Sequence, residues 1–199
     1  MLKKLGFALL ILTLSAAPVA AESMDFELKA GSSSVAGSIN YRKPLYDGYM
    51  KTGISGVYSD DDATEYQWGA IHLLVGNDTL APGLWGEVGF KGIFGSAEER
   101  GYSGDIAVVA FTGNLGYVFP SYLIPVPLEV FGGLTFAPDP LAFMDASTYS
   151  EFTIGVGVHL IQQASIEISY HAYGIEFDEG PGQWDLDDNA VRFGITMRF

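Results

Sequence analysis

Hydrophobic and polar residues alternate with a period of two toward the C-terminus of the chain. The last segment, 190–199, has a hydrophobic residue at every second position: Val191, Phe193, Ile195, Met197 and Phe199. Segments 151–160 and 166–173 repeat this alternation. Because successive side chains of a strand point to opposite faces, each segment is predicted to be a strand with one hydrophobic face.

The same pattern extends in weaker form over the preceding part of the chain. It predicts further strands at 24–30, 33–41, 49–58, 65–75, 84–94, 105–119 and 128–136. The total is about ten, and bacterial transmembrane barrels have an even number of strands. Eight strands is the alternative count, because 33–41 is rich in Ser and Gly and weakly patterned. The predicted fold is therefore all-β, a closed antiparallel up-and-down transmembrane β-barrel.

The links between these strands differ in length and composition. Near the C-terminus, 138–147 and 178–188 are long and acidic, whereas 162–165 is short. A transmembrane barrel has short periplasmic turns and longer external loops. We therefore expect the acidic links outside and the proline-rich links, such as 120–127, on the periplasmic side. Other links are expected at 43–48, 59–64, 76–83 and 95–103.

The N-terminus predicts the compartment. Lys3 and Lys4 precede a hydrophobic run at 5–14, and Val19-Ala20-Ala21 supplies the small residues that signal peptidase requires. The run is too short to cross a bilayer as a helix. We therefore predict a cleavable secretory signal peptide at 1–21 and one domain at 22–199, a barrel in the outer membrane of a Gram-negative bacterium.

Composition excludes several classes of function. The chain has no cysteine, which rules out a lipid-anchoring cysteine, disulfides, a thiolate nucleophile and a cysteine-based zinc site. Without Lys3 and Lys4, 8 of the 10 basic residues remain, against 24 acidic ones. This charge would repel phosphates, so nucleic acid is not an expected partner.

A soluble barrel of the lipocalin type would also alternate, with its hydrophobic face turned inward. Lipid on the outside is favoured because the polar faces are poor in Lys and rich in Gly and Ser, and because the last strand ends in an aromatic residue. That residue, Phe199, is typical of the C-terminal signal by which outer-membrane proteins are recognised for assembly. We therefore expect a monomer whose partners are outer-membrane lipid, lipopolysaccharide and, during biogenesis, the barrel-assembly machinery.

Several short motifs, most of them in the last third of the chain, resemble the YfaZ family of bacterial outer-membrane proteins. They are Ala137-Pro138-Asp139-Pro140, the segment Ile166-Glu167-Ile168-Ser169-Tyr170-His171-Ala172-Tyr173, Asp188-Asn189-Ala190 and Phe199, with Ser59-Asp60-Asp61-Asp62 and Lys91-Gly92 upstream. The resemblance implies a small barrel with porin-like behaviour. It implies no particular reaction, substrate or catalytic residue.

The polar faces of the strands carry charges of both signs that are predicted to face the lumen. These residues are Glu87, Lys91, Glu129, Glu151, Glu167, His171, Arg192 and Arg198. One hypothesis is a narrow polar pore, and the other is a salt-bridged plug. The plug is favoured because a ten-stranded barrel leaves modest room once side chains fill it. The expected function is that of a small porin-like protein with a narrow or plugged polar lumen, or of a structural envelope protein.

An outer-membrane barrel enzyme acting on lipid or peptide is the alternative function. Such a hydrolase needs a His beside an acid where substrate arrives. His72 and His159 are predicted near the periplasmic ends of their strands, which leaves His171 with Glu167 as the one candidate pair. We therefore expect no enzyme, no catalytic residues and no cofactor. A metal site is not expected either, because 185–189 lacks the glycine and terminal glutamate of a calcium loop.

Overall fold

Every segment predicted to be a strand forms one in the computed structural model, which describes residues 23–61, 64–120, 122–178 and 183–199. The main strands are β1 (Ser23–Ala30), β2 (Ser34–Leu45), β3 (Gly48–Asp61), β4 (Thr64–Ala81), β5 (Leu84–Glu99), β6 (Tyr102–Val118), β7 (Leu128–Ala137), β9 (Ala146–Ile161), β10 (Ala164–Phe177) and β11 (Trp184–Arg198). A short 3-10 helix, η2 (Asp139–Leu141), and a three-residue strand, β8 (Ala142–Met144), lie between β7 and β9. The signal peptide predicted at 1–21 lies outside the described residues.

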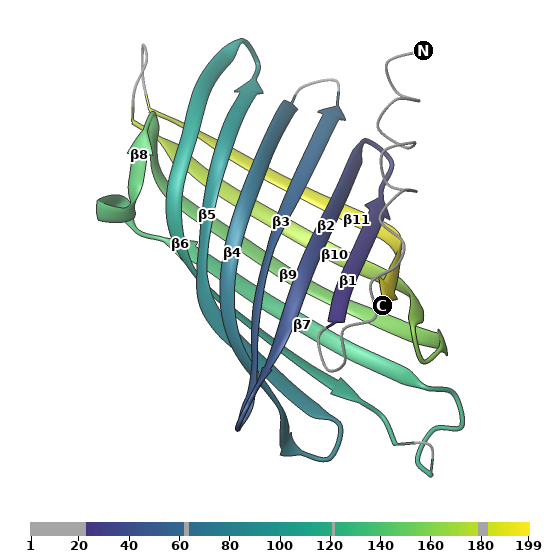
Figure 1. Ribbon diagram of the computed structural model, residues 1–199. Coiled ribbons are helices and arrows are strands. Elements are labelled where there is room, and N and C mark those ends of the chain that lie inside the picture. Colours follow the sequence, from purple (N-terminus) through teal and green to yellow (C-terminus); the bar gives the residue numbers. More distant parts are fainter. Residues whose placement is uncertain (1–22, 62–63, 121, 179–182) are drawn as a thin grey trace.

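The strands form one antiparallel sheet that closes on itself (Figure 1). Each main strand pairs with the next one along the chain, and β11 pairs with β1 through registers such as Phe26↔Met197. The ring contains ten strands, which confirms the closed barrel and the count of ten over eight. Closure gives each of these strands a hydrogen-bonding neighbour on both sides.

The two ends of the barrel are distinguished by the chain termini. At one end, called here the terminal end, the backbone N–H of Met24 donates to the carbonyl of Phe199 at 2.9 Å, and the N–H of Phe199 donates back at 2.8 Å. The opposite end is called the far end. Because the strands run alternately up and down, the links after β1, β3, β5, β7 and β10 lie at the far end.

Most strands are longer than predicted, and the links between them are shorter. The links expected at 43–48, 76–83 and 95–103 are reduced to two-residue turns at 46–47, 82–83 and 100–101. Glycine and polar residues hid the alternation there, although their backbones pair: Gly95, for example, is opposite Trp68. Gly83 has φ +82°, a conformation that an L side chain rarely adopts.

The predicted contrast between long far-end loops and short turns at the terminal end is wrong for several links. The far-end links between β1 and β2 and between β5 and β6 contain only three and two residues. The proline-rich stretch 119–127 is long and lies at the terminal end, between β6 and β7. Its prolines lack the N–H that a strand ladder needs, so the chain there stays irregular.

β7 is interrupted at the far end for the same reason. It ends at Ala137 because Pro138 has no backbone N–H to donate. The chain leaves the barrel wall through η2 and returns as β8, which pairs with β6 at Ile106↔Met144. β8 therefore occupies the part of the wall that a longer β7 would fill. No helix formed by the described residues is long and apolar enough to cross a membrane.

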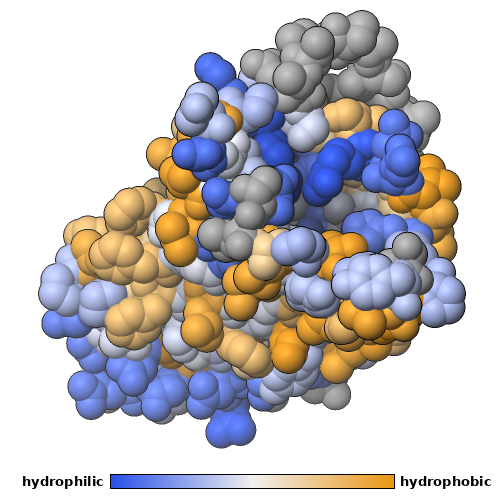
Figure 2. All heavy atoms as spheres, turned by 90° about the horizontal axis from the view of Figure 1, so that it is seen from below, coloured by the Kyte–Doolittle hydropathy of each residue, from blue (hydrophilic) through white to orange (hydrophobic). Residues whose placement is uncertain are grey.

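The outer face of the barrel is hydrophobic along its middle. Exposed side chains there include Ile71, Phe90, Leu134, Phe152, Ile168 and Phe193. Outward-facing charges lie near strand ends, for example Glu98 and Glu176 at the far end and Lys43 at the terminal end. Seen from below, hydrophobic side chains lie along the flank and hydrophilic ones gather in the hollow of the barrel (Figure 2). The hydrophobic face is thus turned outward, the reverse of a soluble lipocalin-type barrel.

Candidate functional site in the barrel lumen

The eight charged or polar side chains predicted to face the lumen all lie inside the barrel. They are Glu87, Lys91, Glu129, Glu151, Glu167, His171, Arg192 and Arg198, and each is hydrogen-bonded or ion-paired to other inward-facing side chains. Strand periodicity accounts for this placement, because residues two apart on a strand share a face.

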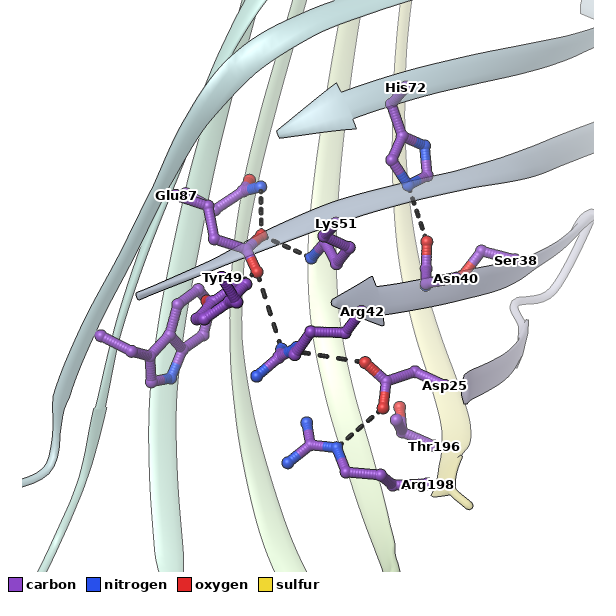
Figure 3. Close-up of polar contacts among 12 residues, drawn as sticks. Asp25, Ser38, Asn40, Arg42, Tyr49, Lys51, His72, Glu87, Thr196 and Arg198 are labelled. Carbon is purple, nitrogen blue, oxygen red and sulfur yellow. Dashed lines mark hydrogen bonds and ion pairs between the residues drawn. The ribbon is translucent and has the colours of Figure 1, made fainter. Parts of the chain in front are cut away.

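Glu87 is the centre of a polar cluster at the terminal end (Figure 3). Its carboxylate is 1% exposed, accepts a hydrogen bond from the Tyr49 hydroxyl at 2.9 Å and forms an ion pair with Lys51. Arg42 Nη2 lies 3.7 Å away, and Asn114 Nδ2 donates at 3.4 Å. Two cations and two neutral donors therefore compensate one buried carboxylate.

Asp25 connects this cluster to the seam between the first and last strands. Its carboxylate accepts from Arg198 Nε at 2.7 Å and lies 3.8 Å from Arg42 Nη2 (Figure 3). The Arg42 guanidinium also lies 4.0 Å from the centre of the Tyr49 ring. The closure of β1 on β11 is thus reinforced by side chains as well as by the backbone.

Two further lysines form ion pairs in the middle of the lumen. Lys29 Nζ lies 3.0 Å from Glu27 and 3.2 Å from Glu167, and Lys91 Nζ lies 2.6 Å from Glu151. The Lys29–Glu167 pair joins β1 to β10, and the Lys91–Glu151 pair joins β5 to β9. They cross the lumen or its wall between strands that are not neighbours in the sheet, as a plug requires.

The three histidines are each bonded within the lumen. His159 Nε2 lies 2.9 Å from Glu129, close to the terminal end, as expected. His72 lies in mid-barrel, where Nε2 is 2.7 Å from the Asn40 amide oxygen. Its expected position near a strand end is therefore wrong, because β4 extends to Ala81 rather than ending near 75.

The Glu167–His171 pair considered for an enzyme is divided between other partners. His171 is bonded through its two ring nitrogens to the hydroxyls of Ser169 and Thr153, at 3.0 and 3.1 Å. Glu167 accepts from Thr196 at 2.7 Å and pairs with Lys29. Both ring nitrogens of His171 are therefore bonded to hydroxyls, and the Glu167 carboxylate is paired with a cation, so the two residues do not bond to each other.

The far end of the lumen is filled by four aromatic side chains, named here the aromatic cap: Tyr66, Trp68, Tyr149 and Tyr173. They are 1%, 6%, 0% and 5% exposed. Tyr66 stacks on Trp68 at 4.3 Å, and the rings of Tyr173 and Tyr149 meet Trp68 edge-on at 5.1 and 6.3 Å. Buried aliphatic and aromatic neighbours complete the layer, including Ile93, Ile106, Val108, Ile175, Phe177 and Leu186. The far half of the lumen is thus a hydrophobic core.

A cavity of about 210 Å³ lies between the aromatic cap and the polar cluster of the terminal end. Lys29, Lys51, Lys91 and Arg192 line it, together with Glu27 and Glu151. The side chains of Lys51 and Lys91 keep 16% of their surface exposed. Because the aromatic cap closes the far end, this exposure indicates access from the terminal end.

Several lumen residues were not predicted from the sequence. Asp25, Glu27 and Lys29 alternate with Met24, Phe26 and Leu28, so their positions could have been read from the pattern. The aromatic cap gave a weaker signal, because its inward rings alternate with outward polar residues such as Gln67 and Ser150, the reverse of the pattern along the middle of the strands. Its neighbours on β6 are hydrophobic on both faces. The run Ile106-Ala107-Val108-Val109-Ala110 shows no alternation at all.

The described residues contain no group of three or more His, Asp or Glu side chains placed to hold a metal ion. The inward carboxylates have side-chain partners instead, as Glu151 has Lys91 and Tyr149, and Glu129 has Trp85 and His159.

Comparisons with known proteins give one family and several structures of similar fold. A family model described as YfaZ precursor matches residues 2–199. No curated protein sequence matches the chain. Among solved structures, the NanC porin is 12% identical, with 89% of this chain and 99% of that chain covered and a TM-score of 0.41. The KdgM porin is 10% identical over 89% and 99%, with a TM-score of 0.38. The translocator domain of the autotransporter NalP from Neisseria meningitidis is 13% identical over 99% and 94%, with a TM-score of 0.40.

Proposed function

The chain belongs to the YfaZ family, and from that premise we propose that it is a structural protein of the bacterial outer membrane whose barrel is sealed rather than an open pore. The observation that carries this proposal is the aromatic cap. Tyr66, Trp68, Tyr149 and Tyr173 are together almost inaccessible, and a hydrophobic layer around them fills the lumen. An ion would lose its hydration in such a layer without gaining compensating partners.

The polar half of the lumen supports the same function. Glu87, Glu151 and Glu167 each form an ion pair with a lysine on a strand that is not their neighbour in the sheet. Because these charges are paired with one another, an entering ion would have to compete with an existing partner. Such a network fixes the strands relative to one another.

The outer surface supports residence in lipid. Its exposed hydrophobic side chains, among them Phe90, Phe152 and Phe193, are suited to hydrocarbon, and the closed sheet pairs the strand backbones internally. We place the terminal end in the periplasm and the acidic far end outside, in contact with lipopolysaccharide. The protein is inserted as a monomer by the barrel-assembly machinery, which recognises the strand ending in Phe199.

The geometry does not favour the alternative of a barrel hydrolase. His171 is held by two hydroxyls, and Glu167 by Lys29 and Thr196. We therefore propose that the protein is not an enzyme. Hydrolysis of a lipid or peptide that is lost in His171→Ala or Glu167→Ala would contradict this.

Conductance of the refolded mature chain in a planar lipid bilayer tests the proposed function. The wild type is expected to give a silent bilayer. The double variant Trp68→Ala with Tyr149→Ala removes two rings of the aromatic cap and is expected to give discrete channel openings. The matched control is Phe90→Ala with Phe111→Ala, a tilted ring pair 5.2 Å apart that lies on the outer face.

The control is expected to stay silent while losing comparable aromatic volume. Stable openings of the wild type would contradict a sealed barrel and make the protein a narrow pore. Faster gel mobility before boiling than after it shows that each variant is folded. Loss of envelope integrity when the gene is deleted would support the structural role directly.

A further inference from the structure

Arg192 differs from the other cations inside the barrel. Its side chain is 1% exposed, and its three nitrogens contact hydroxyl groups. Nε donates to Ser34 Oγ at 2.9 Å, Nη1 to the Tyr173 hydroxyl at 2.8 Å and Nη2 to the Tyr66 hydroxyl at 3.5 Å. The guanidinium also lies 5.4 Å from the centre of the Tyr173 ring.

Each of the other lumen cations in the described part of the chain contacts a carboxylate directly. This holds for Lys29, Arg42, Lys51, Lys91 and Arg198. Among the described residues, Arg192 has no carboxylate within ion-pair distance. One carboxylate compensates it indirectly, because Tyr66 donates its own proton to Asp188 at 2.5 Å and accepts from Arg192.

A buried guanidinium without a direct counter-ion is unusual, because desolvation of a charge is costly unless it is paired. The hydroxyls occupy three of its five N–H donors and carry no charge. Two N–H donors of Arg192 therefore have no hydrogen-bond partner among the described residues, and the aromatic cap separates this site from the far end of the barrel.

The cavity supplies room beside this charge. Arg192 lines it together with Lys29, Lys91 and His171, and hydroxyls of Thr112, Thr135 and Thr153 face the same space. Four cations and two carboxylates, Glu27 and Glu151, line the cavity, and three of these cations, Lys29, Lys51 and Lys91, form direct ion pairs with carboxylates. Arg192 is the lining cation whose charge has no direct partner among the described residues. The cavity volume of about 210 Å³ exceeds several-fold the roughly 30 Å³ that one water occupies in the liquid.

We infer that this cavity is a binding site for a small oxyanion, a carboxylate or a phosphate, with Arg192 as the principal ligand at its closed end. The planar fork of a guanidinium matches two oxygens of such a group. Ser34, Tyr66 and Tyr173 position the fork, and the threonine hydroxyls donate to the remaining oxygens. The anion enters from the terminal end. The proposed site depends only on this geometry, and it does not depend on whether the barrel conducts ions.

Nuclear magnetic resonance of the arginine Nε–H groups tests this inference. The chain has four arginines, so the spectrum of the labelled, refolded mature protein in micelles is simple. Sodium phosphate and sodium acetate are titrated separately against sodium chloride at equal ionic strength. A saturable shift of the Arg192 signal with phosphate, acetate or both is expected, with no comparable shift in chloride. Arg198, 49% exposed and paired with Asp25, serves as the internal control.

The relative affinities for phosphate and acetate identify which oxyanion the site prefers. Arg192→Gln is expected to weaken binding about tenfold or more, the loss that follows from removing a charge-assisted hydrogen bond. Arg198→Gln is the matched control and should bind as the wild type does. Equal shifts in phosphate, acetate and chloride, or no saturable shift, would overturn the inference. Should Arg192→Gln fail to refold, the wild-type titration alone decides the matter.

Discussion

Glu87→Gln is expected to destabilise the barrel strongly, because it removes the charge that compensates Lys51 inside the lumen. The Glu87 carboxylate is 1% exposed and the Lys51 side chain 16% exposed. Breaking a fully buried pair by removing one partner costs about 3–5 kcal/mol. The loss is smaller here for three reasons. The glutamine still offers an acceptor to the Tyr49 hydroxyl, Arg42 still has Asp25 as a counter-ion, and solvent partly screens the charge of Lys51. We therefore expect a loss of about 2–4 kcal/mol in the free energy of unfolding.

Urea unfolding in lipid vesicles, followed by tryptophan fluorescence, measures this loss. With a slope on the order of 2 kcal/mol/M, the midpoint should fall by roughly 1–2 M. Glu98→Gln is the matched control, because Glu98 is exposed on the outer face at the far end, and it should change stability by less than about 0.5 kcal/mol. Equal stability of Glu87→Gln and Glu98→Gln would refute the reasoning that the lumen network is buried and coupled.

Three further predictions concern assembly, packing and ions. Phe199→Ala should slow insertion into membranes more than it lowers equilibrium stability, because Phe199 is 76% exposed; unchanged insertion kinetics would count against its role as a signal. Gly95→Ala should cost about 1–3 kcal/mol, because a Cβ there would lie 2.5 Å from Trp68 Cβ, whereas Gly56→Ala, with 3.7 Å to its nearest neighbour, should be nearly neutral in the same unfolding assay. Calcium should leave the melting temperature unchanged, since the described carboxylates form no three-ligand cluster; a marked rise would reveal an ion site in the acidic loops.

The closed barrel could be predicted because its outer face obeys one rule throughout. Lipid requires hydrophobic residues along the middle of every strand, as in Val191, Phe193 and Ile195, and this imposes a period of two. The strand ends were harder to predict. Glycine at 95 interrupts the alternation without interrupting the backbone pairing, and β4 continues to Ala81 through a register irregularity between Asn77 and Ala81.

The inner face obeys no single rule, and prediction of the site was correspondingly incomplete. Lysine and glutamate residues on the polar faces of the strands identified the half of the lumen at the terminal end. The aromatic cap was not predicted, because Tyr149 and Trp68 face inward where the outward neighbours, such as Ser150 and Gln67, are polar, the reverse of the pattern along the middle of the strands. Partners such as Glu87 with Lys51 are 36 positions apart, and they meet because their strands, β5 and β3, both pair with β4.

Quenching of tryptophan fluorescence by brominated lipids tests the central claim, that hydrophobic side chains face lipid and the lumen is shielded from it. The three native tryptophans are shielded: Trp68 lies in the aromatic cap, Trp85 donates to Glu129 at 2.6 Å, and Trp184 stacks on Phe177 at 4.0 Å. The wild type is expected to be quenched weakly. Phe193→Trp, which places an indole at a position 64% exposed on the outer face, is expected to add a strongly quenched component. Strong quenching of the native tryptophans, or none of the added one, would contradict the account.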